Sequence, residues 1–236
     1  TFLGCGSAFQ VQLESPPYQF EYERTWYSQH GSAVNHICWI VPDARATVDY
    51  LLANGCEARM PYEEFGVYRG FVCTDPEGRW IEIMEYIDDF KTPDVEFRPF
   101  GIPGLQLFGP TQLTNDLPGM ERWYQDVLGL RTVIGSAEAG IVFMADDEFG
   151  PERNIAMILA EPSSEAEQEL FERHGPVIAG VNHQAVDVER ADIDAGAAGF
   201  RRLDELEHDE RTGLLTSTFR EPSGNLIYLR EVLPVT

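Results

Sequence analysis

The chain has 236 residues, an apolar fraction of 43% and a formal charge of −23 at pH 7, with Lys91 as its only lysine. A surface this acidic repels nucleic acid and anionic membranes, so we exclude both as partners. No apolar run is long enough to span a membrane, and the N-terminus lacks the basic segment of a signal peptide, so we expect a cytoplasmic protein. The four cysteines form no CxxC pair, and we expect reduced, buried thiols.

The first half of the chain predicts one β-α-β-β-β module. Residues 1–14 resemble the end of an earlier β unit, and the polar stretch that follows, with its two prolines, is interpreted as a connector. Asp43 is a good N-cap for a helix that Gly55 ends. The expected elements are a strand at 34–41, a helix at 44–54 and strands near 57–61, 67–74 and 79–86.

The second half predicts two more modules after a linker at 87–104, which is rich in charge, proline and glycine. The clearest helix of the chain lies within 113–130, where Asp116 or Asn115 caps it and Gly129 ends it. Strands are expected near 131–135, 140–145 and 154–160, and a short acidic surface helix at 163–173. The last module has a strand at 181–188, a helix near 190–198, an acidic connector at 203–213 and strands at 214–220 and 225–232.

A repeat links the two halves. The segments VNHICWIVPD, from Val34, and FVCTDPEGRWIEIMEY, from Phe71, recur as GVNHQAVDVERAD and TFREPSGNLIYLREV. His36 and His183 are 147 residues apart, and Gly78 and Gly224 are 146 apart. Self-similarity at this spacing indicates a tandem duplication.

Two residues of the first copy stand out in apolar strand rows. His36 shares a strand face with Cys38, and Glu82 shares one with Trp80 and Met84. A carboxylate in such a row is costly to bury unless a positive group meets it, and a bound divalent metal would account for both residues. A histidine and a glutamate that hydrogen-bond each other inside the core are the structural alternative.

These motifs resemble the vicinal oxygen chelate superfamily, which holds glyoxalase I, bleomycin resistance proteins and extradiol dioxygenases. The resemblance rests on the HhxhxVxD-like first strands, the (D/E)PxGxxIE-like last strands and the helix ERWYQDVLGL, in register over most of the chain. It implies an α+β fold of tandem βαβββ modules paired into cup-shaped mixed sheets. The two glyoxalase-like domains would be residues 1–90, with a first module that lacks its first strand and helix, and residues 102–236. The complete modules would be 34–86, 105–160 and 180–232.

The resemblance also implies a metal site. His36 matches the first-strand ligand of the family and Glu82 the last-strand ligand, and a further ligand would come from the first module. Gln10 or Gln12 could supply a donor to the metal or the substrate. The ion would be one divalent metal, Fe(II) or Zn, Mn or Ni. Cys38, Trp80 and Met84 would line an apolar pocket, unless they are merely core.

The second domain departs from the pattern, because Gly109 stands where its first module should carry a ligand. His183 and Tyr228 would form a degenerate second site, and we expect this domain to have a structural or substrate-shaping role. The implied function is a metal-dependent ring-cleaving dioxygenase or a glyoxalase-like lyase or isomerase. Its substrate would chelate the metal through two adjacent oxygens. A metal-free small-molecule binding protein of the bleomycin-resistance type is the alternative, and a homodimer is expected by analogy with the family.

Overall fold

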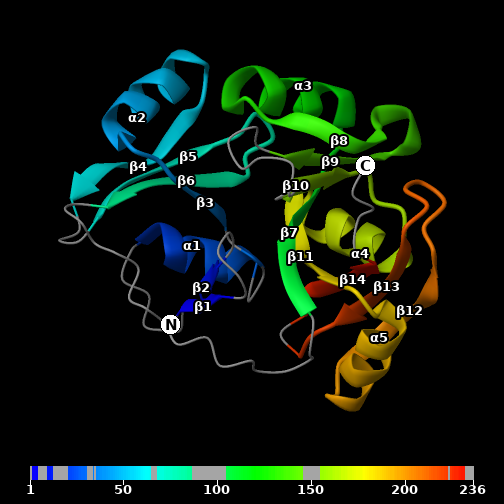
Figure 1. Ribbon diagram of the computed structural model, residues 1–236. Helices are drawn as coiled ribbons and strands as arrows, with labels where there is room; N and C mark the ends of the chain where they lie inside the picture. Colours follow the sequence, from blue (N-terminus) through cyan, green and yellow to red (C-terminus); the bar gives the residue numbers. More distant parts are fainter. Residues whose placement is uncertain are drawn as a thin grey trace. The chain divides into compact units, whose positions relative to one another are not determined.

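The computed structural model divides the chain into two compact units (Figure 1). We call residues 19–29 and 35–96 the N-terminal unit, and residues 1–18, 30–34 and 97–236 the C-terminal unit. The structure describes residues 2–4, 10–12, 21–30, 34, 36–64, 68–86, 105–145, 155–222 and 224–231. The predicted linker at 87–104 lies outside these residues. No helix among them is long and apolar enough to cross a membrane.

The N-terminal unit is built on a four-stranded mixed sheet with the strand order β3-β6-β5-β4, in which β3 and β6 run parallel. Helix α2 lies on one side of this sheet and helix α1 on the other (Figure 1). The predicted β-α-β-β-β order is confirmed. The elements are α1 (Glu21–His30), β3 (His36–Ile40), α2 (Ala44–Ala53), β4 (Glu57–Glu64), β5 (Tyr68–Thr74) and β6 (Trp80–Tyr86).

Local signals explain where α2 begins and ends. The Asp43 carboxylate accepts a hydrogen bond from the backbone N–H of Ala46 at 2.9 Å, as expected of an N-cap. Gly55 follows the helix with a φ of 86°, a left-handed conformation that a residue with a Cβ adopts only with strain. Between these ends, Val48 and Leu51 are buried against the sheet.

Helix α1 corrects the interpretation of residues 15–33 as a connector. Most residues of this helix are polar, and Trp26 is the one buried hydrophobic residue among its described side chains. The helix therefore shows no apolar stripe. The Trp26 ring packs against that of Trp80 on β6, with 5.1 Å between their centroids. A ten-residue helix of this kind depends on such tertiary contact, which the sequence does not display.

The C-terminal unit contains one eight-stranded mixed sheet with the order β12-β13-β14-β11-β7-β10-β9-β8. Each half repeats the strand order of the N-terminal unit, and the antiparallel pair β7 and β11 joins the halves. Two modules therefore pair into one sheet, as predicted. The elements are β7 (Leu105–Leu113), α3 (Leu117–Leu128), β8 (Arg131–Ser136), η1 (Ala137–Ala139), β9 (Ile141–Ala145), β10 (Ile155–Ala160), α4 (Glu165–His174), β11 (Val177–Ala185), α5 (Val188–Ala197), β12 (Arg201–His208), β13 (Leu215–Arg220) and β14 (Leu226–Glu231).

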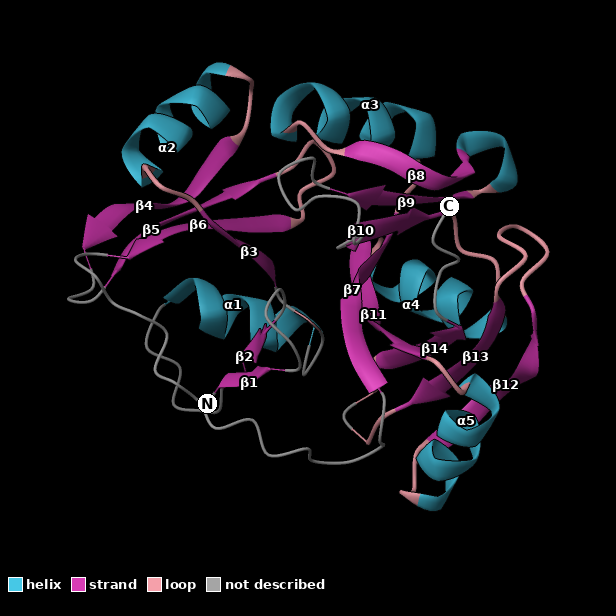
Figure 2. Ribbon diagram, in the orientation of Figure 1, coloured by secondary structure: helices cyan, strands magenta, loops and turns pink. Residues whose placement is uncertain are grey.

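The eight-stranded sheet is curved, and its helices cover both of its faces. Figure 2 shows α3 and α5 outside the curve and α4 inside it. The acidic helix expected at 163–173 is present as α4, and half of its ten residues are exposed, while Ala166 and Glu167 are buried and the helix packs on β11. A capping box between Ser164 and Glu167 fixes the start of α4. The inner face of this sheet is thus closed by a helix of its own unit.

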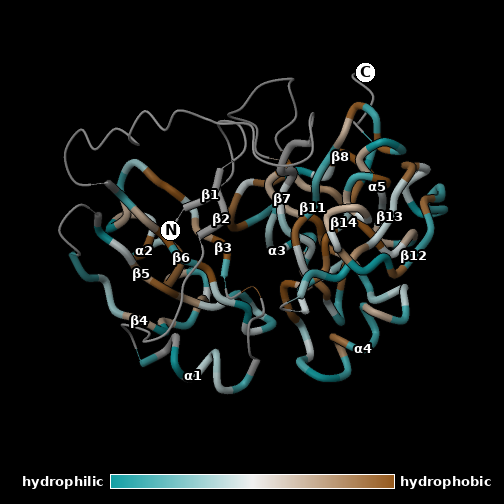
Figure 3. The backbone as a smooth tube through the Cα atoms, turned by 90° about the horizontal axis from the view of Figure 1, so that it is seen from below, coloured by the Kyte–Doolittle hydropathy of each residue, from teal (hydrophilic) through white to brown (hydrophobic). Residues whose placement is uncertain are grey.

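Strand β12 is the second correction, because the sequence predicts a connector there. Its residues are mostly charged on both faces, and it lies at the edge of the sheet (Figure 3). Edge strands of natural sheets often carry charges, which discourage pairing with another chain. Separately, β1 (Phe2–Gly4) and β2 (Gln10–Gln12) form a two-stranded antiparallel sheet. The described strands do not show the predicted pairing of this segment with the module at 34–86.

Candidate metal centre

His36 and Glu82 meet on one face of the N-terminal sheet. In the parallel pair β3 and β6, Cys38 lies directly beside Glu82, and His36 lies beside Trp80, so all four side chains share one face. The His36 Nε2 atom is 3.1 Å from Glu82 Oε2, and the two side chains are 18% and 9% exposed. This is the face on which α1 packs through Trp26.

The surroundings of this pair are largely apolar. Trp80 is half-buried against Trp26, and Met84 is buried two residues beyond Glu82 on the same strand face. Cys38 is exposed as a residue, yet enough of the protein surrounds its sulfur that desolvation raises the pKa of its thiol well above the usual value. The negative charge of Glu82, and a hydrogen bond to its carboxylate, raise the pKa of this thiol further.

The donor pair fits a divalent metal in chemistry and in spacing. Imidazole and carboxylate are ligands that zinc, iron and manganese accept. Two ligand atoms that each lie about 2.1 Å from one ion, at right angles, are about 3 Å apart, close to the 3.1 Å between Nε2 and Oε2. The same distance also permits a direct hydrogen bond, as the structural alternative requires.

Among the described side chains, the candidate metal site has two donors, His36 and Glu82. Within this part of the chain, no group of three or more His, Cys, Asp or Glu side chains is arranged to hold a metal. Gln10 and Gln12 lie in β2, and their side chains are outside the described part of the structure. The prediction that either of them contributes a donor therefore stays a prediction.

The structure separates the residues of the predicted second site. His183 on β11 pairs with Leu229 on β14, whereas Tyr228 pairs with Asn182. Because neighbouring residues of a strand point to opposite faces, His183 and Tyr228 lie on opposite sides of the sheet. Burial lowers the pKa of His183 to about 4, and its Nδ1 atom has no hydrogen-bond partner among the described residues. The described strands therefore do not bring His183 and Tyr228 together in one site.

The helix caps that follow the two histidines give a different alignment of the two copies from the histidines themselves. Asp43 caps α2 and Asp187 caps α5. His36 precedes its cap by seven residues, but His183 precedes its cap by only four. Counting back seven residues from Asp187 gives Gly180, which is therefore the counterpart of His36.

Glycine occupies this position in both modules of the C-terminal unit, because Gly109 precedes its own cap, Asp116, by the same seven residues. A Cβ atom at Gly109 would lie 2.9 Å from the carbonyl oxygen of Ile155, and one at Gly180 would lie 1.9 Å from that of Leu226. A neighbouring strand thus fills the space that a ligand side chain would need.

Polar side chains of the same unit fill the inner face of the eight-stranded sheet. The Tyr228 hydroxyl donates to the carboxylate of Glu167 on α4 at 3.0 Å, and burial raises the pKa of Tyr228 well above its usual value. The guanidinium of Arg230 is buried between the rings of Phe143 and Tyr228 and donates from Nε to Asn182 at 2.9 Å. Among the described residues, Arg230 supplies a buried cation on this face.

The sequence reasoning missed Arg230 and Glu167, although a usable signal was present. Arg230 follows Tyr228 by two residues in a predicted strand, so both belong to one strand face. A charge in an apolar row was the argument that singled out Glu82. The same argument applied to Arg230 would have predicted a buried charge with partners of its own.

No family model and no curated protein matches the sequence. Solved structures do match the fold. The chain aligns with a Mn(II)-bound glyoxalase from Novosphingobium aromaticivorans with a TM-score of 0.56, 14% identity and coverage of 86% of this chain and 64% of that chain. It also aligns with a 2,2′,3-trihydroxybiphenyl 1,2-dioxygenase from Sphingomonas wittichii, with a TM-score of 0.58, 15% identity and coverage of 86% of this chain and 72% of that chain. For a mutant 4-hydroxymandelate synthase from Streptomyces coelicolor, the TM-score is 0.60 and the identity 13%, and the alignment covers 94% of this chain and 76% of that chain.

The chain has the vicinal oxygen chelate fold. It spans 64% of the length of the glyoxalase, so it corresponds to part of that protein. The predicted α+β class, with βαβββ modules in mixed sheets, is confirmed. Within the fold, the His36–Glu82 pair belongs to the first and last strands of one module.

Proposed function

We propose that this chain is part of a metal-dependent enzyme of the glyoxalase or dioxygenase type. Its substrate would be a small molecule that chelates one divalent metal through two adjacent oxygens. The observation that carries the proposal is the contact between His36 Nε2 and Glu82 Oε2 at 3.1 Å, on the sheet face that also presents Trp80. A carboxylate that is 9% exposed among apolar side chains requires a cation or a hydrogen-bond donor.

In this proposal, His36 and Glu82 hold the metal, which when bound supplies a Lewis acid or, as Fe(II), a centre that activates oxygen. The rigid strands β3 and β6 fix both donor atoms, so little ordering remains to be done when an ion binds. Trp80 and Met84 make the surroundings apolar, which keeps water away and favours an aromatic or otherwise apolar substrate.

Two reaction classes remain within the proposal. Fe(II) would indicate cleavage of an aromatic vicinal diol with oxygen, and Zn, Mn or Ni would indicate a lyase or isomerase. Among the solved structures with this fold, one is named as a Mn(II)-bound glyoxalase and another as a halotolerant catechol dioxygenase. Both names concern those proteins, and they define the two panels of substrates to test here.

The deciding experiment is elemental analysis of the purified full-length protein beside His36→Ala and Glu82→Gln. We expect about one equivalent of metal in the wild type and its loss in both variants, because a site with few protein donors does not retain an ion after losing one. His208→Ala and Glu63→Gln are matched controls, since both residues are exposed and neither belongs to β3 or β6. These controls should keep the metal.

The identity of the retained metal then selects the assay. Iron leads to oxygen consumption with catechols, and zinc, nickel or manganese leads to isomerase and lyase substrates. A wild-type protein that holds no metal after anaerobic reconstitution with each of these ions would refute the enzyme proposal. Retention of metal by both His36→Ala and Glu82→Gln would place the site elsewhere.

A metal-free small-molecule binding protein is the second candidate. It is favoured by the finding that the described side chains contain no group of three or more metal donors. In that case His36 and Glu82 satisfy each other by their hydrogen bond, and the apolar residues around them contact the ligand. Binding of an aromatic ligand that is unchanged by EDTA, in a protein without metal, would support this candidate.

Three further expectations stay proposals. We propose a homodimer, which sedimentation of the full-length protein tests, and a cytoplasmic location, which fractionation of the source cells tests. We also propose domain limits of 1–90 and 102–236, with residues 1–14 as the end of the first module. Expression of residues 102–236 alone, with a cooperative unfolding transition, would support these limits.

A further inference from the structure

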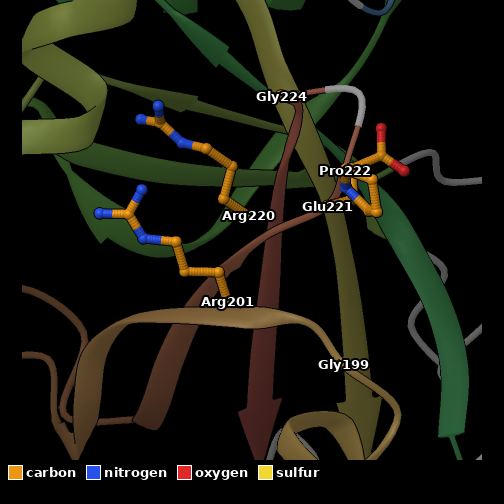
Figure 4. A pocket seen from close by; sticks show the side chains of 6 residues that line it. All are labelled: Gly199, Arg201, Arg220, Glu221, Pro222 and Gly224. Carbon is orange, nitrogen blue, oxygen red and sulfur yellow. The ribbon is translucent and has the colours of Figure 1, made fainter.

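A pocket of about 270 Å³ lies at the edge of the C-terminal sheet, outside the candidate metal centre (Figure 4). It is formed where the chain leaves α5 and enters β12, and where β13 turns into β14. The residues that line it are Gly199, Arg201, Arg220, Glu221, Pro222 and Gly224. Two of the six are arginines, in a chain that has 17 basic and 40 acidic residues.

The two arginines are direct cross-strand neighbours. Arg201 opens β12 and Arg220 ends β13, and the antiparallel register places them opposite each other. Figure 4 shows both side chains extending to the same side of the strands, with their guanidinium groups next to each other. Like charges in directly opposed positions destabilise a strand pair. In so acidic a chain, an unrelieved arginine pair at this position needs an explanation.

The carboxylates of the described residues neutralise this pair incompletely. Arg220 Nη2 donates to Glu169 Oε2 at 3.0 Å, but Glu169 also accepts from Arg173 at 2.8 Å, so one carboxylate serves two arginines. The Nε of Arg220 is buried and has no hydrogen-bond partner among the described residues. Arg201 is exposed, and the described part of the chain supplies it with no ion-pair partner.

One acidic residue also lines the pocket, and its carboxylate points elsewhere. Glu221 accepts a hydrogen bond from the side-chain amide of Asn225 within the turn between β13 and β14. Figure 4 shows its carboxylate on the opposite side of the strand from the two guanidinium groups. The Glu221 carboxylate thus faces away from the guanidinium groups of Arg201 and Arg220.

We propose that this pocket binds a small organic anion through the guanidinium groups of Arg201 and Arg220. The recognised group is an oxyanion, either a carboxylate or a phosphate, because its oxygens match the planar fork of donors on each guanidinium. The bound oxyanion accepts from the guanidinium groups of Arg220 and Arg201, and it removes the repulsion between them. A pocket of about 270 Å³ has room for a small molecule attached to the oxyanion.

This site is independent of the proposed metal chemistry, because all of its residues belong to the C-terminal unit and none is a candidate metal ligand. The strong negative charge of the whole protein opposes the approach of anions over long distances. Salt screens that repulsion beyond about 10 Å at 0.1 M ionic strength, whereas contacts within the pocket are screened much less.

The test is isothermal titration calorimetry of the full-length chain with inorganic phosphate and, separately, with malonate. The buffer is Tris with 0.1 M sodium chloride, which contains no competing oxyanion. The variants are Arg201→Gln and, as a control, Arg190→Gln. Arg190 is an exposed arginine on α5 that pairs with Asp194, so the control removes the same charge outside the pocket.

We expect saturable binding of one phosphate or malonate per chain, weakened at least about tenfold by Arg201→Gln and less than about twofold by Arg190→Gln. Tighter binding of phosphate or of malonate identifies which oxyanion the pocket prefers. Arg220→Gln should weaken binding as much as Arg201→Gln does. Arg201 makes no ion pair with the described residues, so Arg201→Gln removes no such contact from the described part of the fold. Absence of saturable binding of both anions, or equal weakening by Arg201→Gln and Arg190→Gln, would overturn the proposal.

Discussion

Replacement of His183 by leucine should change how the stability of the protein depends on pH. His183 lies on β11 beside Leu229, on the side of the sheet where α5 packs. Burial lowers the pKa of its imidazole to about 4, and its Nδ1 has no hydrogen-bond partner among the described residues. The folded protein therefore holds a neutral histidine.

The sign of the effect follows from proton binding. A histidine in the unfolded chain has a pKa of about 6.5, above the value of about 4 in the folded protein. Below pH 6.5 the unfolded chain binds a proton at His183 that the folded protein does not bind. The contribution of the neutral His183 to stability is therefore fully present above pH 6.5 and is lost as the pH falls toward 4. At pH 5, which is about 1.5 units below the unfolded value, the loss relative to pH 8 is about 2 kcal/mol.

The assay is urea denaturation of the wild type and of His183→Leu at pH 5, 6, 7 and 8. Because both proteins share all other titrating groups, the difference in their free energies of unfolding isolates His183. We expect that difference to move by about 2 kcal/mol in favour of the variant between pH 8 and pH 5. His208→Gln, which removes an exposed histidine, should follow the wild type. A difference that does not vary with pH would show that the folded protein accommodates a protonated His183, and the reasoning from burial would be refuted.

Two further substitutions test the contacts of the C-terminal unit. Tyr228→Phe removes the hydroxyl that donates to the buried carboxylate of Glu167, and we expect a loss of about 1–3 kcal/mol in urea denaturation; an unchanged midpoint would contradict this contact. Gly180→Ala would place a Cβ atom 1.9 Å from the carbonyl oxygen of Leu226, so we expect a loss of roughly 1–3 kcal/mol or more. In contrast, Gly196→Ala in α5 meets no atom within 4 Å and should raise stability by about 0.5–1 kcal/mol; equal effects of the two alanines would rule out the proposed strand contact.

Helix caps and turns made most of the fold predictable. Asp43 and Asp116 cap α2 and α3 as expected, and Gly129 ends α3 with a φ of 70°. These signals are local, since a capping side chain bonds to the backbone within three residues. Together with the recurrence of the strand patterns, they determine the β-α-β-β-β order of each module. That order was then enough to place the chain in its fold.

The elements that the sequence did not predict depend on contacts between distant segments. Helix α1 is held by Trp26 against Trp80, which lies 54 residues later in the chain. Strand β12 is charged on both faces and forms because β13 offers it a free edge. Neither contact leaves a periodic pattern in the sequence, so pattern analysis assigned both segments to connectors.

The two histidines show how far a site can be predicted from a pattern. His36 and Glu82 were singled out by their polarity in apolar rows, and the parallel register does bring them together. His183 was chosen because it shares the letters VNH with His36, but similarity of letters does not fix the strand register. Because side chains alternate between the two faces of a strand, a shift by three residues, or by any odd number, moves a side chain to the opposite face. The number of residues between the histidine and the helix cap that follows it does fix the register, because both belong to one continuous strand and turn.

The inner faces of the two units satisfy buried charge in different ways. In the C-terminal unit, Arg230 bonds to Asn182 and lies between two aromatic rings, while Glu167 receives the hydroxyl of Tyr228. Each of these groups has a partner from the same unit, and α4 covers them, so this face needs no ligand. In the N-terminal unit, the only cationic partner that the described residues offer Glu82 is a histidine, which is a weaker base than arginine and a good metal ligand. A fixed guanidinium makes an inner face permanently structural, whereas an imidazole and a carboxylate 3.1 Å apart can exchange their mutual hydrogen bond for a shared ion. The division of roles that we propose for the two units rests on this one difference in chemistry.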